Sequence, residues 1–144
     1  MRIISGVFKG KKILKPKDLN TRPLKDLTKE SIFNILNHSN KLNVSVNKSN
    51  VLDIFSGVGS FGIDCLSRGA VRVFFIENYQ KVLLILKKNL SNLTSINNYK
   101  VIEKDAYEKK TLSNLNCKFD IIFLDPPYKD KNLDRLLIEI SNHK

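Results

Sequence analysis

Val51-Leu52-Asp53-Ile54-Phe55-Ser56-Gly57-Val58-Gly59-Ser60-Phe61-Gly62 is the stretch of sequence that decides the fold. It begins as an apolar run, breaks into three spaced glycines and then continues with helical spacing. A strand buried on both faces of a parallel sheet is continuously apolar, and glycines at its carboxyl end let the backbone pass close to a ligand. The stretch therefore predicts a strand, a glycine turn and a helix, an arrangement at which nucleotide-like cofactors bind. Which cofactor binds is left open.

The rest of the chain repeats this alternation of apolar runs and helical patterns. Further strands are predicted at Val71–Ile76, Tyr99–Ile102 and Phe119–Leu124. Apolar residues recur at helical spacing around them, which predicts helices near Ser60–Arg68, Val82–Leu93, Tyr107–Leu115 and Leu133–Ile140. Four strand and helix pairs in succession indicate an α/β fold with a right-handed, doubly wound parallel sheet.

The amino-terminal part is expected to form a small arm. Arg2–Pro16 alternates short apolar pairs with glycine and lysine, which predicts a hairpin with turns near Gly6 and Gly10. A helix is predicted over Asp26–Asn37, with its first residue placed to cap it. The chain is therefore expected to divide into an arm, residues 1–40, and a cofactor domain, residues 41–144.

The charge favours an anionic partner. The 144 residues carry a formal net charge of +11 and the pI is about 9.7, so nucleic acid is the first candidate. A composition rich in lysine and asparagine also arises in AT-rich genomes. The positive charge could therefore reflect genome composition instead of an anionic partner, and both explanations stay open. On the arm, phosphate-binding lysines are predicted at Lys9, Lys11, Lys12, Lys15 and Lys17.

Cysteine usage and hydropathy disfavour several classes of protein. Cys65 and Cys117 are far apart and outside any CxxC or Cys/His pattern, so neither a disulfide framework nor a metal site is expected. No apolar run approaches the roughly 20 residues that span a bilayer, and the first residues lack a signal-peptide pattern. We therefore expect one compact, cytoplasmic chain without a metal or a membrane partner.

Acidic residues follow the predicted strands at the edge where ligands bind in such sheets. They are Asp53, Glu77, Asp105 and Asp125. The three glycines of the opening stretch form a GxGxxG pattern, and Glu77 lies 20 positions beyond Gly57, as a ribose-binding carboxylate does in dinucleotide enzymes. Because GxGxxG alone is a weak signal, an NAD-dependent oxidoreductase is one alternative.

Two features favour a different cofactor. Asp53 lies in the approach to the glycines, where a carboxylate repels a pyrophosphate but can hold the ammonium group of an amino-acid moiety. Asp125-Pro126-Pro127-Tyr128 follows the last predicted strand, and its prolines fix φ, remove two N–H donors and leave carbonyls free. A carboxylate beside a proline carbonyl offers two acceptors to an exocyclic amine, and Tyr128 offers a face to a flipped base.

Taken together, these motifs resemble a known family. The strand-end motifs are DxFxGxG at Asp53–Gly59, the acids Glu77 and Asp105, and DPPY at Asp125–Tyr128. They are similar to those of the Rossmann-like class I methyltransferases, which depend on S-adenosylmethionine. The arm adds RIISGxxKGKKI from Arg2, TRP at Thr21–Pro23 and KESIFNIL at Lys29–Leu36. With the arm included, the chain resembles the bacterial family that methylates the N2 amine of a guanine in 16S ribosomal RNA.

The resemblance implies a role for each matching residue. S-adenosylmethionine would be held by Asp53, Phe55, Gly57, Gly59, Glu77, Asp105 and Ala106, with Phe33 and Asn34 of the arm closing over it. The catalytic residues would be Asp125, Pro126, Pro127 and Tyr128. RNA would be bound by Lys9, Lys11, Lys12 and Arg22. The implied partner is ribosomal RNA, in the small ribosomal subunit or an assembly intermediate.

The sequence departs from this family in two respects. Leu24 and Leu27 stand where its members usually carry Thr and Arg. Its sheet has seven strands with the fourth in the centre, so Ile121–Leu124 is expected to have an uncovered edge here. Either the sequence is a fragment, or another chain or self-association covers that edge. Two further alternatives stay open: an adenine-N6 methyltransferase acting on DNA or RNA, and a truncated, noncatalytic RNA-binding fragment.

Overall fold

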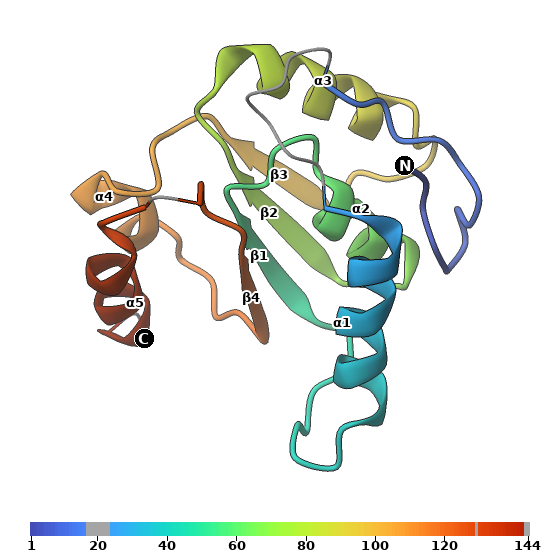
Figure 1. Cartoon of the computed structure of the whole chain (residues 1–144), viewed down its shortest axis with the longest axis horizontal. Coiled ribbons are helices and arrows are strands. Elements are labelled where there is room, and N and C mark those ends of the chain that lie inside the picture. Colours follow the sequence, from blue (N-terminus) through green and yellow to red (C-terminus); the bar gives the residue numbers. More distant parts are fainter. Residues whose placement is uncertain (17–23, 129, 143–144) are drawn as a thin grey trace.

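The computed structural model describes residues 1–16, 24–128 and 130–142. Its centre is a parallel sheet with the strand order β3-β2-β1-β4 (Figure 1). The strands are β1 (Asn50–Ile54), β2 (Arg72–Ile76), β3 (Tyr99–Ile102) and β4 (Ile121–Leu124). Each is followed by a helix, and the predicted α/β class with a doubly wound parallel sheet is confirmed.

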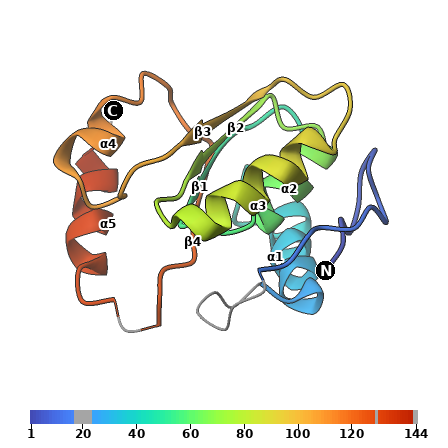
Figure 2. The same ribbon diagram turned by 90° about the horizontal axis from the view of Figure 1, so that it is seen from above.

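Helices cover both faces of this sheet. They are α1 (Asp26–His38), α2 (Ser60–Ser67), α3 (Gln80–Ser91), α4 (Lys109–Ser113) and α5 (Leu133–Asn142). Viewed from above, α4 and α5 lie on one side of the sheet and α1, α2 and α3 on the other (Figure 2). Within the described ranges, no helix has both the length and the apolar character needed to cross a membrane.

Each central strand contributes to two apolar clusters, which explains its continuously apolar sequence. Val51 and Val73 pack with residues of α2 and α3 on one face. Leu52 and Phe74 pack with residues of α4 and α5 on the other. Successive side chains of a strand point to opposite faces, so both layers of helices find an apolar surface.

β4 is the edge strand of this sheet. It pairs in parallel with β1 on one side, and among the described residues no strand pairs with its other side. Ile121 is buried, whereas Ile122, Phe123 and Leu124 are only partly buried. The expected free edge is therefore present, and its coverage by self-association stays a prediction.

The amino-terminal arm forms the predicted hairpin. Arg2 and Lys12 form an antiparallel bridge, and Gly6 and Gly10 adopt φ values of 85° and 87°. A Cβ at Gly6 would lie 1.9 Å from the Ser67 carbonyl oxygen. The turn at Gly6 therefore needs glycine both for its left-handed backbone and for the close contact with α2.

A buried ion pair joins the arm and α1 to helix α2. Lys29 Nζ lies 2.7 Å from Asp64 Oδ2, and both side chains are 0% exposed. The same lysine donates to the Arg2 carbonyl at 2.9 Å, and Asp64 Oδ1 accepts from the Ile4 amide at 2.9 Å. Ile3 of the arm belongs to the same apolar cluster as the sheet, while the division at residue 40 stays a prediction.

The predicted element bounds need small corrections. Asp26 does not cap α1, because it is the first helical residue, and Lys25 occupies the N-cap position without a side-chain capping hydrogen bond. The helix predicted over Tyr107–Leu115 is the short α4, because the residues before it form a turn held by Asp105. β4 begins two residues later than predicted.

Candidate functional site

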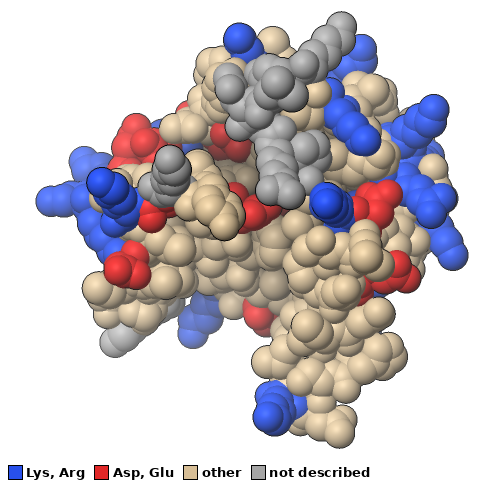
Figure 3. All heavy atoms as spheres, in the orientation of Figure 1, with Lys and Arg blue, Asp and Glu red and all other residues tan. Residues whose placement is uncertain are grey.

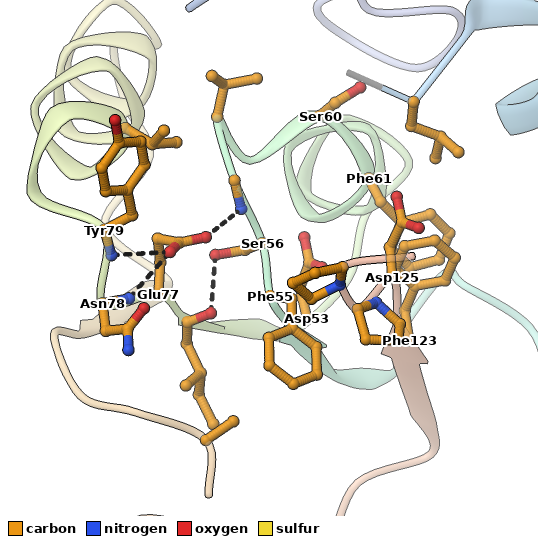
Figure 4. A pocket seen from close by; sticks show the side chains of 18 of the residues that line it. Asp53, Phe55, Ser56, Ser60, Phe61, Glu77, Asn78, Tyr79, Phe123 and Asp125 are labelled. Atoms are coloured by element: carbon orange, nitrogen blue, oxygen red, sulfur yellow. Dashed lines mark hydrogen bonds between the residues drawn. The ribbon is translucent and has the colours of Figure 1, made fainter. Parts of the chain in front are cut away.

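A cavity of about 970 Å³ lies at the carboxyl ends of the strands. Its walls come from the loops after all four strands and from the start of α1. Figure 4 shows Glu77 and Asp125 on opposite sides of this cavity, with Asp53 and Phe55 between them. The structure thus brings together the strand-end acids predicted from the sequence.

Glu77 is held by three backbone amides. Its Oε2 accepts from the Gly57 amide at 2.8 Å, and its Oε1 accepts from the amides of Asn78 and Tyr79 at 2.9 Å each (Figure 4). A carboxylate oxygen has two acceptor sites, so Oε2 retains one for a ligand hydroxyl. The loops after β1 and β2 are therefore joined through a carboxylate that faces the cavity.

Asp53 is almost completely buried at the floor of the cavity. Its exposed fraction is 1%, and its Oδ2 accepts from the Gly62 amide in α2 at 2.9 Å. Burial raises the pKa of this carboxyl to about 8, against a lowering effect of the Gly62 hydrogen bond, and the nearby charges of Asp125 and Glu77 add to the rise. Asp53 is consequently a neutral acid below this pH unless a cation lies beside it.

The three glycines of the GxGxxG pattern have different roles. Gly57 lines the cavity, while Gly59 and Gly62 do not. A Cβ at Gly59 would lie 2.4 Å from Leu86 Cδ1, and a Cβ at Gly62 would lie 2.3 Å from Phe75 Cε1. Gly59 and Gly62 therefore allow α2 to pack closely against α3 and β2. A direct contact of Gly59 with the cofactor stays a prediction.

One end of the cavity is apolar. Phe55 has a left-handed backbone with φ of 60°, and its ring centroid lies 5.6 Å from that of Tyr107. Ala106 is buried at 3% exposure beside them. Asp105 closes the same turn, since its Oδ1 accepts from the Tyr107 amide at 3.0 Å. This end combines flat apolar surfaces with a carboxylate, as a purine-binding pocket does.

The opposite end carries the DPPY segment, Asp125–Tyr128. Asp125 is accessible from the cavity, and partial loss of hydration raises its pKa. Among the described residues, no intramolecular donor reaches its carboxylate or the Pro126 carbonyl. Tyr128 is fully exposed at the rim. Two free acceptors and an open aromatic face therefore meet at one edge of the cavity.

An aromatic stack supports the strand that carries this segment. The ring centroids of Phe123 and Phe61 lie 4.0 Å apart, and Phe61 also stacks on Phe33 with the ring centroids 5.1 Å apart. The Arg68 guanidinium also lies over the Phe33 ring, 3.9 Å from the ring centroid. The stack connects α1 of the arm through α2 to the end of β4, where Asp125 begins.

The chemistry of the cavity fits S-adenosylmethionine. The Ser60 hydroxyl is buried in the cavity wall without a hydrogen-bond partner among the described residues. Asp53 and Glu77 provide acceptors for an ammonium group and for hydroxyls, and the apolar end provides space for a flat ring. An unpaired buried hydroxyl is costly in a folded protein, and a polar ligand would satisfy it.

The structure does not bring every predicted residue to this cavity. Phe33 is buried in the aromatic stack and Asn34 is exposed elsewhere on α1, and neither lines the cavity. Their contact with the cofactor stays a prediction. Lys17 and Arg22 lie outside the described residues. The other predicted phosphate-binding lysines are exposed on the arm, and their contact with RNA stays a prediction; they are Lys9, Lys11, Lys12 and Lys15.

Several cavity residues were not predicted from the sequence. The arm contributes Leu24, Lys25 and Thr28, the start of α2 contributes Ser60, and the loops contribute Tyr107 and Asp130. The first three stand beside the TRP and KESIFNIL motifs, but nothing in their pattern marks them as lining residues. Tyr107 follows the predicted Asp105 by two positions, and this proximity is the signal that could have identified it.

The charged residues are unevenly distributed over the face that carries the cavity. In Figure 3, lysine and arginine side chains gather over the arm and α3 on one side and over α4 on the other. Acidic side chains lie between these two regions and also among the basic side chains on both sides. A polyanion would be attracted to the basic regions, while the acids that line the cavity favour a cationic or neutral group.

Comparisons with known proteins agree with these features. The family model described as "Conserved hypothetical protein 95" matches residues 1–144. "Putative rRNA methyltransferase YlbH" of Bacillus subtilis is 34% identical over 145 residues, which cover 100% of this chain and 76% of that protein. "Ribosomal RNA small subunit methyltransferase D" of Buchnera aphidicola (subsp. Baizongia pistaciae) is 39% identical over 129 residues, covering 90% of this chain and 62% of that protein.

A solved structure extends the similarity to the fold. "Putative methyltransferase yhhF from Escherichia coli" superposes with a TM-score of 0.77 at 28% identity. The superposition covers 99% of this chain and 72% of that one. This chain thus spans between about three fifths and three quarters of the length of these three proteins.

Proposed function

This chain belongs to the family described as conserved hypothetical protein 95, whose relatives include methyltransferases of small-subunit ribosomal RNA, and we propose that it transfers a methyl group from S-adenosylmethionine to RNA. The acceptor we propose is the exocyclic N2 amine of a guanine in 16S ribosomal RNA. The strand-end motifs resemble those of the Rossmann-like methyltransferases that depend on S-adenosylmethionine, which supports this choice of methyl donor.

The observation that carries this proposal is the free carboxylate of Asp125. It is reachable from the cavity and has no intramolecular donor among the described residues. The neighbouring Pro126 carbonyl likewise accepts no hydrogen bond from the described residues. An exocyclic amine has two N–H donors, and these two acceptors match them. A nicotinamide cofactor carries no ammonium group to place beside the buried Asp53, whereas the amino-acid moiety of S-adenosylmethionine does.

Four residues of the chain are suited to hold the cofactor. Asp53 would accept from its ammonium group, Glu77 from its ribose hydroxyls, and the turn at Asp105 and Ala106 would contact its adenine. When bound, S-adenosylmethionine supplies an electrophilic methyl group on a sulfonium. Gly57 leaves room for this group because its backbone approaches the cavity without a Cβ.

The protein's part in the reaction is mainly positioning. The lone pair of a guanine N2 amine is delocalised into the ring, so the amine is a weak nucleophile. Hydrogen bonds to Asp125 and the Pro126 carbonyl would favour a pyramidal nitrogen and orient it for in-line attack. Asp125 need not remove a proton beforehand, because the methylated ammonium is acidic enough to lose one afterwards. Tyr128 would stack on the flipped base.

The test is to map the methyl group on its acceptor. The purified chain is incubated with isotopically labelled S-adenosylmethionine and either protein-free 16S rRNA or assembling small subunits, and the product is digested for mass spectrometry. We expect labelled N2-methylguanine. A label on adenine N6 would replace the proposal with the adenine alternative. Absence of cofactor binding in calorimetry would favour the noncatalytic fragment.

Asp53 gives a prediction for the pH dependence of cofactor binding. In the free protein its pKa is about 8, so at pH 6.5 it is protonated. An ammonium group beside it stabilises the charged form and lowers the pKa. Binding of S-adenosylmethionine at pH 6.5 should therefore release about one proton, and affinity should rise with pH up to about 8.

Calorimetry in two buffers of different ionisation enthalpy measures this proton. Asp53→Asn should release none and bind more weakly. Without cofactor, the stability contributed by the neutral form is present at low pH and is lost as pH rises from 3.8 towards about 8. Asp53→Asn should remove this decline in a series of thermal melts. Equal binding heats in both buffers would contradict the assignment.

A further inference from the structure

The loops after the two outer strands of the sheet are joined by one side-chain hydrogen bond. The Tyr107 hydroxyl donates to Oδ2 of Asp130. Tyr107 follows β3 and Asp130 follows β4, and these strands lie at opposite edges of the sheet. Both residues line the cavity. The bond therefore links its apolar end directly to the end that carries the DPPY segment.

On the apolar side, Tyr107 is fixed by its own loop. Its amide donates to Asp105 Oδ1 at 3.0 Å, and the Asp105 carbonyl accepts from the Thr111 hydroxyl at 2.8 Å. The Tyr107 ring packs against Phe55 with the ring centroids 5.6 Å apart. The position of the hydroxyl thus depends on Asp105 and Phe55, which line the end proposed for the adenine.

On the other side, Asp130 is fixed to the DPPY segment. Its amide donates to the Pro127 carbonyl at 3.0 Å. Its Oδ1 accepts from the Asn132 amide at 2.9 Å, just before α5 begins. With Oδ2 taken by Tyr107, each carboxylate oxygen of Asp130 has one partner. A shift of the Tyr107 hydroxyl would therefore be transmitted to Asp130 and to Pro127.

We propose that Tyr107 and Asp130 are positioning residues that couple occupation of the cofactor end to the placement of Asp125, Pro126 and Tyr128. Adenine packed against Ala106 and Phe55 restricts the loop that carries Tyr107. Because the Tyr107 hydroxyl is hydrogen-bonded to Asp130, the position of Asp130 is restricted as well. The hydrogen bond from the Asp130 amide to the Pro127 carbonyl then restricts the neighbouring acceptors, Asp125 and the Pro126 carbonyl. Base capture is thereby favoured when the methyl donor is already present. This inference rests on the proposed function.

A purely structural role is the competing explanation, because α4 and α5 also meet through apolar contacts. Leu112, Leu115 and Leu136 pack in one cluster with Ala106. If the hydrogen bond only joined the two helices, its loss would lower stability without changing how the DPPY side responds to a cofactor. A test must therefore measure how the DPPY side of the cavity responds when a ligand binds at the cofactor end, in addition to activity.

Amide hydrogen exchange by NMR measures that transmission, with S-adenosylhomocysteine as the probe. The amides of Asp130 and Asn132 are hydrogen-bonded and report on the DPPY side. In the parent protein we expect the probe to slow their exchange. In Tyr107→Phe, which keeps the ring, the probe should still bind within about threefold, while the extra protection should fall about tenfold, as for loss of a hydrogen bond to a charged group.

Matched variants separate coupling from general damage. Tyr99→Phe makes the same chemical change on β3 outside the cavity and should retain the full response. Asp130→Asn removes the charge from the other partner, and the Tyr107→Phe/Asp130→Asn double variant should lose no more protection than either single variant. In transfer assays, the Tyr107→Phe change should appear in the KM for RNA more than in the affinity for the cofactor.

Each outcome has a distinct meaning. If the probe binds and Tyr107→Phe retains the protection of Asp130 and Asn132, the coupling is wrong while the proposed function stands. The same holds if the effects of the two single variants add in the double variant. If the parent protein does not bind S-adenosylhomocysteine at all, the proposed function is wrong, and the inference that rests on it is overturned with it.

Discussion

Asp125→Ala is expected to lower the rate of methyl transfer by about 10²–10³-fold, the cost typical of removing one preorganised group that contacts the reacting atoms. The carboxylate is one of only two acceptors proposed for the amine, and the remaining Pro126 carbonyl cannot orient both hydrogens. The cofactor contacts lie on the other loops, so the affinity for S-adenosylmethionine should stay nearly unchanged. Single-turnover transfer and calorimetry measure the two quantities separately.

Two further variants sharpen this prediction. Asp125→Asn keeps the size of the side chain and one acceptor oxygen, so its rate should lie between those of the parent and Asp125→Ala. Asp134→Ala, an exposed acid in the first turn of α5, should transfer at the parental rate. A strong loss of cofactor affinity in Asp125→Ala, with little change in the transfer step, would place Asp125 in the cofactor site instead.

Lys29→Ala is expected to lower the free energy of unfolding by about 3–5 kcal/mol, the range for removing one partner of a buried ion pair. Asp64 is 0% exposed and would be left as a buried charge without its lysine. The Arg2 carbonyl would lose a donor in the same substitution. Domains of this size have total stabilities of about 5–15 kcal/mol, so urea unfolding followed by circular dichroism should show a large shift.

The cost of leaving the Asp64 charge unpaired can be separated from the cost of losing the packing of the lysine side chain. Lys29→Met combined with Asp64→Asn removes both charges but keeps an oxygen that accepts from the Ile4 amide. This double variant should be clearly more stable than Lys29→Ala. Lys88→Ala, an exposed position on α3, should change stability by less than about 0.5 kcal/mol. If Lys29→Ala behaves like Lys88→Ala, the ion pair does not hold the arm.

The sheet and its ligand edge could be predicted because their signals are local. Continuous apolar runs such as Val51–Ile54 mark buried strands, and the crossover rule then places all carboxyl ends at one edge. Glu77 was predicted from its distance to Gly57, and the 2.8 Å hydrogen bond between them shows that the spacing reflects a contact. Local pattern and tertiary structure agree at these positions.

The remaining features depend on neighbours that are distant in sequence. Gly62 matches a cofactor fingerprint, yet its Cβ space is occupied by Phe75 of β2. Phe33 lies in a motif of the arm, but its place is decided by stacking on Phe61. The sequence around Lys29 predicts a surface lysine, whereas in the structure the side chain is buried against Asp64. The Tyr107–Asp130 hydrogen bond joins loops that follow two non-adjacent strands. No local pattern encodes these pairings.

The way the arm is attached has a consequence for synthesis of the chain. Ile4 and Phe8 donate to side chains of α2, and Leu14 donates to Asn89 of α3, across separations of 59 to 75 residues. A chain emerges from the ribosome amino terminus first, so the arm is exposed before its binding partners have been made. Closing such long loops costs entropy before any contact compensates it. We therefore expect the arm to dock late, after α2 and α3 have packed on the sheet.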